Sequence, residues 1–209
     1  MSKDNTKDRL LDAAERLFAE KGVKETSVRE ITRAAEAHLS SINYHFSTKY
    51  GLIRAVIGRR IKPLNRRRLE LLESFKAEAG EDPVPIEKIL YALIMPGLEM
   101  YSDYPNFLLF AGRMISDPDK KLHRIFVAQL DDFFLRIKDL LQRNLTDIPE
   151  DELMWRIHFA IGAVIHTWTN HSDLEIRSKG VCKIRDKDEM VKRLVAFCAA
   201  GLRAPKSED

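Results

Sequence analysis

The chain has 209 residues, 44% of them hydrophobic and 32% charged, a composition that supports a packed core and excludes a disordered chain. No apolar run approaches about 18 residues, the N-terminus lacks a signal-peptide core, and Cys182 and Cys198 form no metal-type or redox-type pair, so we expect a cytoplasmic protein without a membrane span. Residues 1–68 carry 16 Lys and Arg against 8 Asp and Glu, whereas residues 69–209 carry 19 against 24; this favours nucleic acid as a partner of the N-terminal third, and the alternative is chance surface charge.

The first predicted helix covers about residues 6–21, and Gly22 supplies its C-terminal stop. Its apolar residues recur at helical spacing on one face, at Leu10, Leu11, Ala14, Leu17 and Phe18. A second, two-turn helix follows in TSVREITRAA. Ser27 is a good N-cap for it, and Glu30, three residues later, completes a capping box. Its predicted buried side consists of Val28, Ile31 and Ala35.

A third short helix is predicted within LSSINYHFSTKYGLI, residues 39–53. Ile42 and Phe46, four residues apart, anchor one face in a three-helix core. The other face carries small or hydrogen-bonding residues: Ser40, Ser41, Asn43, Tyr44 and His45. Two short helices joined by a tight turn, the second small and polar, are typical of a helix-turn-helix whose second helix enters the DNA major groove. Lys49 begins the next helix, where its charge and the free N–H groups attract a phosphate.

The rest of the chain is also predicted to be helical. Pro63 should kink or restart the helix that begins near Lys49, and the arginine run at residues 66–68 favours a solvated face over a DNA contact. Residues 76–85 have the Gly, Pro and charge content of a linker. The later helices are predicted at about residues 86–101, 104–116, 118–145, 149–171 and 187–202.

At this point the sequence is similar to a known family. AAERLFAEKGVKETSVREITRAA and INYHFSTKYGLI resemble the DNA-binding domain of TetR-family transcriptional regulators over about residues 6–54. The resemblance implies an all-α protein of about nine helices, with a three-helix helix-turn-helix DNA-binding domain at residues 1–54 and a helical ligand-binding and dimerisation domain at residues 55–209. It implies a repressor that forms a homodimer, binds a double-stranded DNA operator and is released by a small apolar ligand.

The DNA-binding residues expected from this match lie on the second helix, on the third helix and at the start of the fourth: Ser27, His38, Ser40, Ser41, Asn43, Tyr44, His45 and Lys49. Two positions depart from the family pattern. Glu36 replaces the usual glycine of the turn, where a positive φ costs about 1 kcal/mol or more, so the turn is open to a different shape. His38 replaces a small polar N-cap, so either Ser40 shares the capping or the helix starts late.

Bulky apolar residues in the C-terminal part suit an adaptable ligand cavity as well as an ordinary core. The resemblance favours the cavity, with a lining of Phe107, Phe110, Met114, Phe133 and Phe159. Arg113, between two of these residues, is a candidate partner for an acidic ligand group; the alternative is a structural ion pair.

A second stretch, MWRIHFAIGAVIHTW at residues 154–168, narrows the resemblance. Together with Asn43 to Phe46, the segment from Trp155 to Phe159 resembles the branch of long-chain fatty-acid-responsive regulators of pseudomonads. That branch implies a fatty acid or an acyl-CoA as the ligand. The resemblance also implies a four-helix dimer interface built from this helix and the helix at residues 187–202.

No enzymatic site is expected. His158, His166 and His171 lie in or near one predicted helix, but no Glu or Cys joins them at a metal-ligand spacing. The sequence lacks a phosphate-cradling glycine motif and a nucleophile elbow, so we predict no metal, no cofactor and no catalysis. The alternative is an all-helical small-molecule carrier or enzyme with a vestigial helix-turn-helix.

Overall fold

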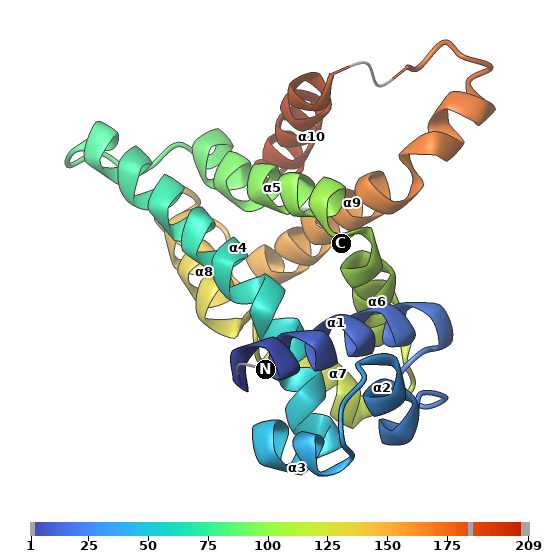
Figure 1. Cartoon of the computed structure of the whole chain (residues 1–209). Coiled ribbons are helices and arrows are strands. Elements are labelled where there is room, and N and C mark those ends of the chain that lie inside the picture. Colours follow the sequence, from blue (N-terminus) through green and yellow to red (C-terminus); the bar gives the residue numbers. More distant parts are fainter. Residues whose placement is uncertain (1–2, 184–185, 206–209) are drawn as a thin grey trace. The chain divides into compact units, whose positions relative to one another are not determined.

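The computed structural model describes residues 3–183 and 186–205, and every regular element in these residues is a helix (Figure 1). The predicted all-α class is therefore confirmed. The helices are α1 (Lys3–Lys21), α2 (Val28–Ala34), α3 (Ser40–Phe46), α4 (Lys49–Ala79), α5 (Ile86–Asp103), α6 (Pro105–Ser116), α7 (Lys120–Val127), α8 (Asp131–Asn144), α9 (Glu150–Arg177) and α10 (Lys187–Leu202). No helix in the described ranges is long and apolar enough to cross a membrane.

The helices form two compact units. The first unit contains Met1–Asn65 and Ser102–Asp131, and the second contains Arg66–Tyr101 and Asp132–Asp209. Helices α6 and α7 thus pack with the N-terminal helices although they follow α5 in the sequence. Helix α4 contributes residues to both units. Each unit is made of two separate stretches of the chain, so the units do not correspond to the domains expected on either side of residue 54. That domain boundary stays a prediction.

The first unit is built around α1. The predicted apolar face of α1 is buried, with Leu10, Ala14 and Phe18 inaccessible to solvent. This face contacts α2, α3 and α6, and the Phe18 and Phe110 rings lie 5.4 Å apart. The buried side predicted for α2 is confirmed at Ile31 and Ala35, whereas Val28 is half-buried. Burial of these residues positions the short helices α2 and α3, which are too short to be stable alone.

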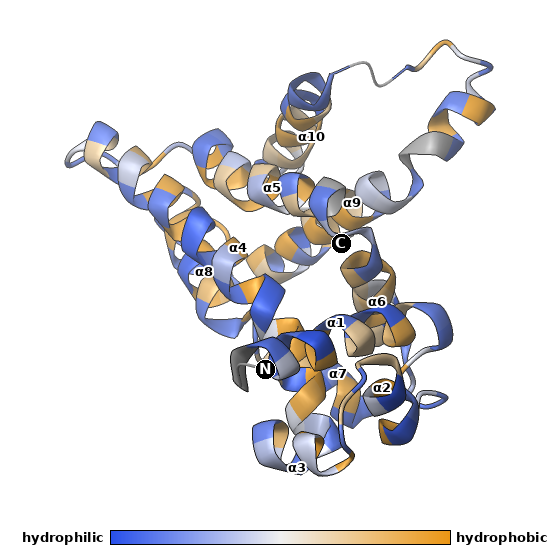
Figure 2. Cartoon of the chain, in the orientation of Figure 1, coloured by the Kyte–Doolittle hydropathy of each residue, from blue (hydrophilic) through white to orange (hydrophobic). Residues whose placement is uncertain are grey.

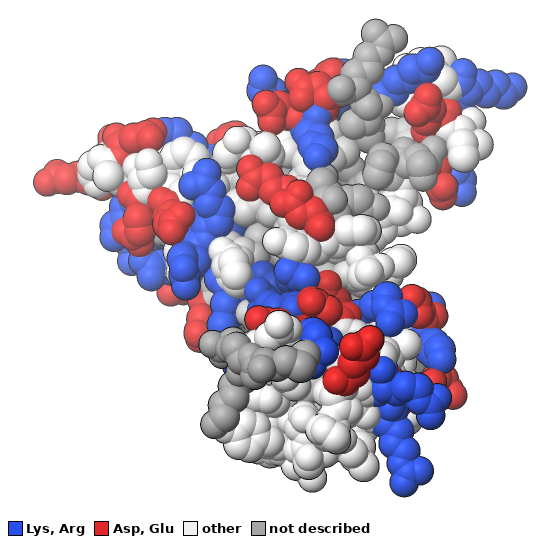
Figure 3. All heavy atoms as spheres, in the orientation of Figure 1, with Lys and Arg blue, Asp and Glu red and all other residues white. Residues whose placement is uncertain are grey.

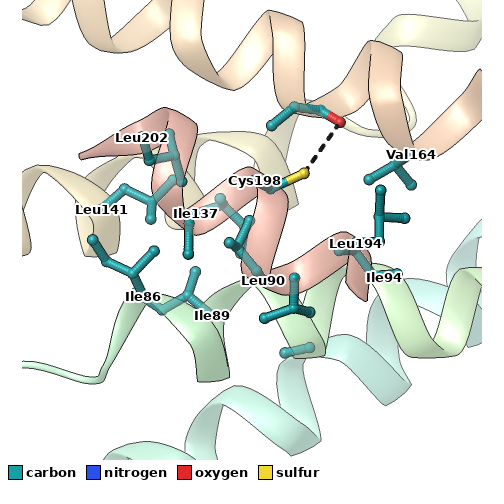
Figure 4. Close-up of a cluster of buried hydrophobic side chains, with 14 of the residues drawn as sticks. Ile86, Ile89, Leu90, Ile94, Ile137, Leu141, Val164, Leu194, Cys198 and Leu202 are labelled. Atoms are coloured by element: carbon teal, nitrogen blue, oxygen red, sulfur yellow. Dashed lines mark hydrogen bonds between the residues drawn. The ribbon is translucent and has the colours of Figure 1, made fainter. Parts of the chain in front are cut away.

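The second unit has an apolar core, mostly of aliphatic side chains from α5, α8, α9 and α10 (Figure 4), to which Leu72 of α4 and the aromatic rings of Phe133 and Trp168 also belong. Figure 4 shows the Cys198 thiol, which donates a hydrogen bond to the Ala160 carbonyl oxygen of α9 at 4.0 Å. Burial raises the pKa of this thiol. Hydrophobic and hydrophilic residues alternate along these helices, as expected when one face of each is buried (Figure 2).

Three predicted elements differ in the structure. Helix α4 continues through Pro63, which excludes the predicted restart, whereas the predicted kink stays a prediction. The helix predicted at residues 118–145 is divided into α7 and α8, because the Gln129 and Leu130 N–H groups bond to carbonyls three residues back, which ends α7 in a tight turn. The apolar faces on either side of this turn pack in different units. Helix α9 continues to Arg177, past the predicted end, with non-helical torsions at Asn170.

Candidate nucleic-acid interface

The predicted capping box at the start of α2 is confirmed. The Ser27 hydroxyl accepts a hydrogen bond from the Glu30 N–H at 3.2 Å, and the Glu30 carboxylate accepts one from the Ser27 N–H at 2.8 Å. Lys21 adds an ion pair to Glu30 at 3.0 Å. The Ser27 N–H, followed by Lys21, lowers the pKa of Glu30 to about 2. Since a hydroxyl both accepts and donates, the exposed Ser27 side chain keeps its proton available for an external oxygen.

The turn between α2 and α3 keeps a left-handed residue although glycine is absent. Glu36 has φ 48°. The Glu36 N–H donates to the Arg33 carbonyl at 3.1 Å, and the Ala37 N–H donates to the Thr32 carbonyl at 2.9 Å. These two bonds form a Schellman motif, which requires a positive φ at its central residue. The departure at Glu36 therefore leaves the turn shape intact and places strain in the backbone.

Helix α3 starts late and has no side-chain cap. Its N-cap residue is Leu39, which makes no capping side-chain hydrogen bond, and the first α-helical residue is Ser40. The Ser41 N–H donates to the backbone carbonyl of His38 at 3.0 Å. Of the two expectations raised by His38, the structure therefore shows the late start.

The two faces of α3 are arranged as predicted. Ile42 and Phe46 are buried and hold the helix against the first unit. The opposite side is uncharged (Figure 3), with Ser40, Asn43 and Tyr44 exposed and Ser41 and His45 half-buried. Tyr44 is 67% exposed, and its ring meets that of His45 edge to face at 4.8 Å. An exposed phenol ring on a short anchored helix is available to contact a partner.

Lys49 lies at the start of α4 with its ammonium already engaged. Its Nζ donates to the Val23 carbonyl at 2.6 Å, and burial lowers the pKa of the lysine. This bond ties the loop after α1 to the first turn of α4. An ammonium has three N–H donors, so Lys49 can also meet a phosphate.

Sequence reasoning missed three neighbours of Lys49. The Thr48 hydroxyl caps α4 by accepting from the Gly51 N–H at 3.0 Å, which a Ser-Thr pair before the helix could have indicated. Gly51 permits close approach to α3, because a Cβ there would lie 2.0 Å from the Phe46 carbonyl oxygen. The Lys121 ammonium lies over the Tyr50 ring, and its Nζ is 3.8 Å from the ring centroid. This last contact joins residues far apart in the sequence, so no local pattern could predict it.

The six predicted ligand-binding residues are divided between the two compact units. Four of them lie on α6 in the first unit: Phe107, Phe110 and Met114 are buried there, and the Arg113 guanidinium donates to the Glu20 carbonyl at 3.3 Å. The other two lie in the second unit, where Phe133 is buried and Phe159 is 64% exposed on α9. No bound molecule tests these roles, so they stay predictions.

Arg68 corrects the prediction of a solvated arginine run. Arg66 and Arg67 are exposed, but Arg68 is buried, and burial lowers its pKa to about 9. Its Nε donates to the Leu93 carbonyl at 3.2 Å, and its guanidinium lies 4.8 Å from the centre of the Phe133 ring. Helical spacing could have indicated this burial, because Arg68 lies four residues from both Leu64 and Leu72 on the apolar face of α4.

Two protein families match this chain. The family described as "Bacterial regulatory proteins, tetR family" matches residues 10–56. The family described as "Tetracyclin repressor-like, C-terminal domain" matches residues 91–201. The first range contains α2, α3 and the start of α4, so the match covers the candidate interface.

Individual proteins are similar over different lengths. The probable HTH-type transcriptional regulator YttP of Bacillus subtilis (strain 168) is 40% identical over 55 residues, 26% of this chain and 27% of YttP. The HTH-type transcriptional regulator SrpR of Pseudomonas putida is 25% identical over 143 residues, 68% of this chain and 62% of SrpR. The alignments thus span less than two thirds of these relatives. The crystal structure of the transcriptional regulator FadR from Bacillus subtilis in complex with stearoyl-CoA has a TM-score of 0.68 and 14% identity, over 93% of this chain and 98% of that one, which shows a shared fold.

Proposed function

Because this chain belongs to the TetR family of bacterial transcriptional regulators, we propose that it is a dimeric repressor that binds an operator through α3 and is released by a small apolar ligand. The observation that carries the proposal is the exposed, uncharged polar face of α3, anchored by Ile42 and Phe46. Ser40, Ser41, Asn43 and Tyr44 are suited to base edges or the nearby backbone. Ser27, His38, His45 and Lys49 are suited to positioning phosphates.

The test is fluorescence anisotropy of the full chain on labelled duplexes covering the DNA upstream of its own gene. Tyr44→Ala should weaken specific binding by roughly ten-fold or more, since a good base contact contributes about 1–3 kcal/mol. Lys49→Gln should weaken binding and its salt dependence, since it removes a phosphate contact. Leu109→Ala, which truncates an exposed residue of α6, is the matched control. Far-UV circular dichroism confirms folding. Unchanged operator affinity in both folded variants would favour a carrier or enzyme with a vestigial helix-turn-helix.

We further propose that α9 and α10 form the homodimer interface. The two helices contact each other, and they expose large apolar side chains: Trp155, Phe159 and Phe197. The Trp155 and Phe159 rings stack at 5.9 Å, and Phe197 is 70% exposed. A second copy of the same helix pair would cover this face in a four-helix arrangement. Dimerisation would place two copies of α3 in successive major grooves about 34–36 Å apart.

Sedimentation velocity tests the interface. Phe159→Glu and Phe197→Glu should convert the dimer to monomers and weaken operator binding, whereas Leu135→Glu, at an exposed position of α8, should leave the dimer intact. A dimer that persists in both variants would exclude this face.

The ligand we propose is a long-chain fatty acid or acyl-CoA. The support is the resemblance of residues 43–46 and 155–159 to fatty-acid-responsive regulators, together with the fold shared with the FadR that is described in complex with stearoyl-CoA. Binding would stabilise one conformer of the body and, through α4, which carries Lys49 and ends in the second unit, lower DNA affinity.

Titration of the protein–DNA complex with stearoyl-CoA tests this finer proposal. Release of DNA would support it. Tight binding that ignores the lipid would leave the repressor proposal standing and exclude the ligand class.

A further inference from the structure

Helix α7 has one buried face and one basic face. Leu122, Ile125 and Phe126 are buried in the first unit. Lys120, Lys121 and Arg124 are exposed. Because Lys120 and Arg124 are four residues apart and Lys121 is adjacent, the three cations lie on neighbouring parts of one helical surface. We call these three residues the α7 basic face.

This face lies beside the candidate interface. The Lys121 ammonium is 3.8 Å from the ring centroid of Tyr50, in the first turn of α4 next to Lys49. The loop before α7 is tied to the loop before α2, because Lys24 and Asp117 form an ion pair at 2.9 Å. The start of α7 therefore neighbours the first turn of α4 and the loop that leads to Ser27.

The two carboxylates that directly precede α7 are already engaged. Asp117 is paired with Lys24, and the Asp119 side chain caps α7 by accepting from the Lys121 N–H at 2.9 Å. Across the ranges that the structure describes, Lys120 and Arg124 form no ion pair. A polyanion can therefore approach them without displacing a bound carboxylate.

Several other cations of the first unit are engaged inside it. Arg59 pairs with Asp12 and Glu15 at 2.7 and 3.0 Å, and Arg60 pairs with Glu15 at 3.0 Å. Lys49 donates to a carbonyl, and α3 presents no Lys or Arg. Yet phosphate neutralisation by Lys and Arg supplies most non-specific DNA affinity. Within the helix-turn-helix, Arg29 and Arg33 of α2 are exposed, and cations beside the motif would add to this attraction.

We propose that the α7 basic face is a second DNA-contacting surface, which binds backbone phosphates flanking the bases read by α3. This inference rests on the proposed DNA-binding function. It extends the interface to a helix that lies more than 50 residues beyond α3 in the sequence and belongs to the same compact unit. Its contribution is to affinity and salt dependence rather than to sequence choice.

The test compares salt dependence in the full-length dimer. The variant Lys120→Gln, Lys121→Gln, Arg124→Gln is titrated against the same upstream duplex as wild type at several KCl concentrations. Each phosphate that is no longer neutralised should reduce the slope of log K against log salt by about 0.9. Because each subunit loses three cations, the slope should fall by roughly 2 to 5 and affinity at low salt by at least about 100-fold. Discrimination between this duplex and a scrambled one should change little.

Two further variants keep the result interpretable. Lys120→Gln with Arg124→Gln leaves the Lys121–Tyr50 contact in place, so a smaller slope there cannot come from a disturbed α4. Lys76→Gln, Arg143→Gln, Arg177→Gln removes the same charge from exposed positions of the second unit. An unchanged slope in the α7 variants, or an equal fall in the second-unit control, would overturn the α7 proposal alone. Failure of the wild type to bind any upstream duplex would overturn the repressor function itself.

Discussion

Helices α2 and α3 have the same length, seven residues, but are stabilised in different ways. Both ends of α2 are stabilised by local hydrogen bonds: a reciprocal Ser27–Glu30 capping box at the start and a Schellman motif at the end. Helix α3 has no side-chain cap and is held by two buried anchors, Ile42 and Phe46. Its stability therefore comes from tertiary packing rather than from its own sequence.

The difference suits the proposed division of labour. Helix α2 supports α3, and hydrogen bonds at its own two ends stabilise it without contacts from a partner. A reading helix must leave most of its short length free for base edges, so buried anchors on one face serve it better than polar caps that occupy its exposed end.

The largest loss of stability is expected when one of the two buried anchors of α3 is truncated. Phe46→Ala removes a buried aromatic ring and should lower the free energy of unfolding by about 3–5 kcal/mol, with loss of operator binding. Urea denaturation measures it. Tyr44→Ala on the exposed face is the control and should change stability by less than about 1 kcal/mol. Similar losses in both variants would mean that α3 is not held by its anchors.

The next effect concerns the caps. Ser27→Ala should lower the free energy of unfolding by about 1 kcal/mol, because the Glu30 N–H loses its acceptor. Ser40→Ala, at the first residue of the uncapped α3, should stay within about 0.5 kcal/mol of wild type. Thermal melting of both proteins measures the difference. A larger loss at Ser40 would contradict the contrast between the two helices.

A gain in stability is expected at the turn between the helices. Glu36→Gly relieves a non-glycine residue at φ 48° and should raise the free energy of unfolding by about 0.5–1 kcal/mol. The Arg9–Glu36 pair that it removes is long, at 3.9 Å, and exposed, so it should offset little. Urea midpoints of wild type and Glu36→Gly measure the change in stability. A loss of stability would show that the contacts of the Glu36 side chain stabilise the fold by more than its backbone strain costs.

The smallest effect is a pH dependence confined to α2. The pKa of Glu30 is lowered from 4.5 to about 2 in the folded chain. A carboxylate with a lowered folded pKa stabilises the fold above its unfolded pKa, and this stabilisation is lost as the pH falls towards the folded value. The stability difference between wild type and Glu30→Gln should therefore be constant above about pH 5 and shrink between pH 4.5 and 2. A difference independent of pH would exclude the ionised capping box.

Prediction from sequence succeeded where the physical cause lies within a few residues. The Gly22 stop, the capping box and the spacing of Ile42 and Phe46 follow from helix geometry alone. It failed at the α7–α8 break, because no glycine or proline marks that turn and the two apolar faces pack in different units. The candidate ligand residues are divided between the two units, and on α6 the side chains of Phe107, Phe110 and Met114 are buried whereas Arg113 is exposed.

The sequence by itself determined that the chain is helical, that it carries a helix-turn-helix, and which residues α3 buries or exposes. Local periodicity and capping act over one or two turns, so the order of residues is sufficient for these features. Only the tertiary structure decided that α6 and α7 join the first unit, that the Lys49 ammonium binds the Val23 carbonyl, and that Lys121 lies over Tyr50. These contacts join residues more than 20 positions apart, and the packing of whole helices brings them together.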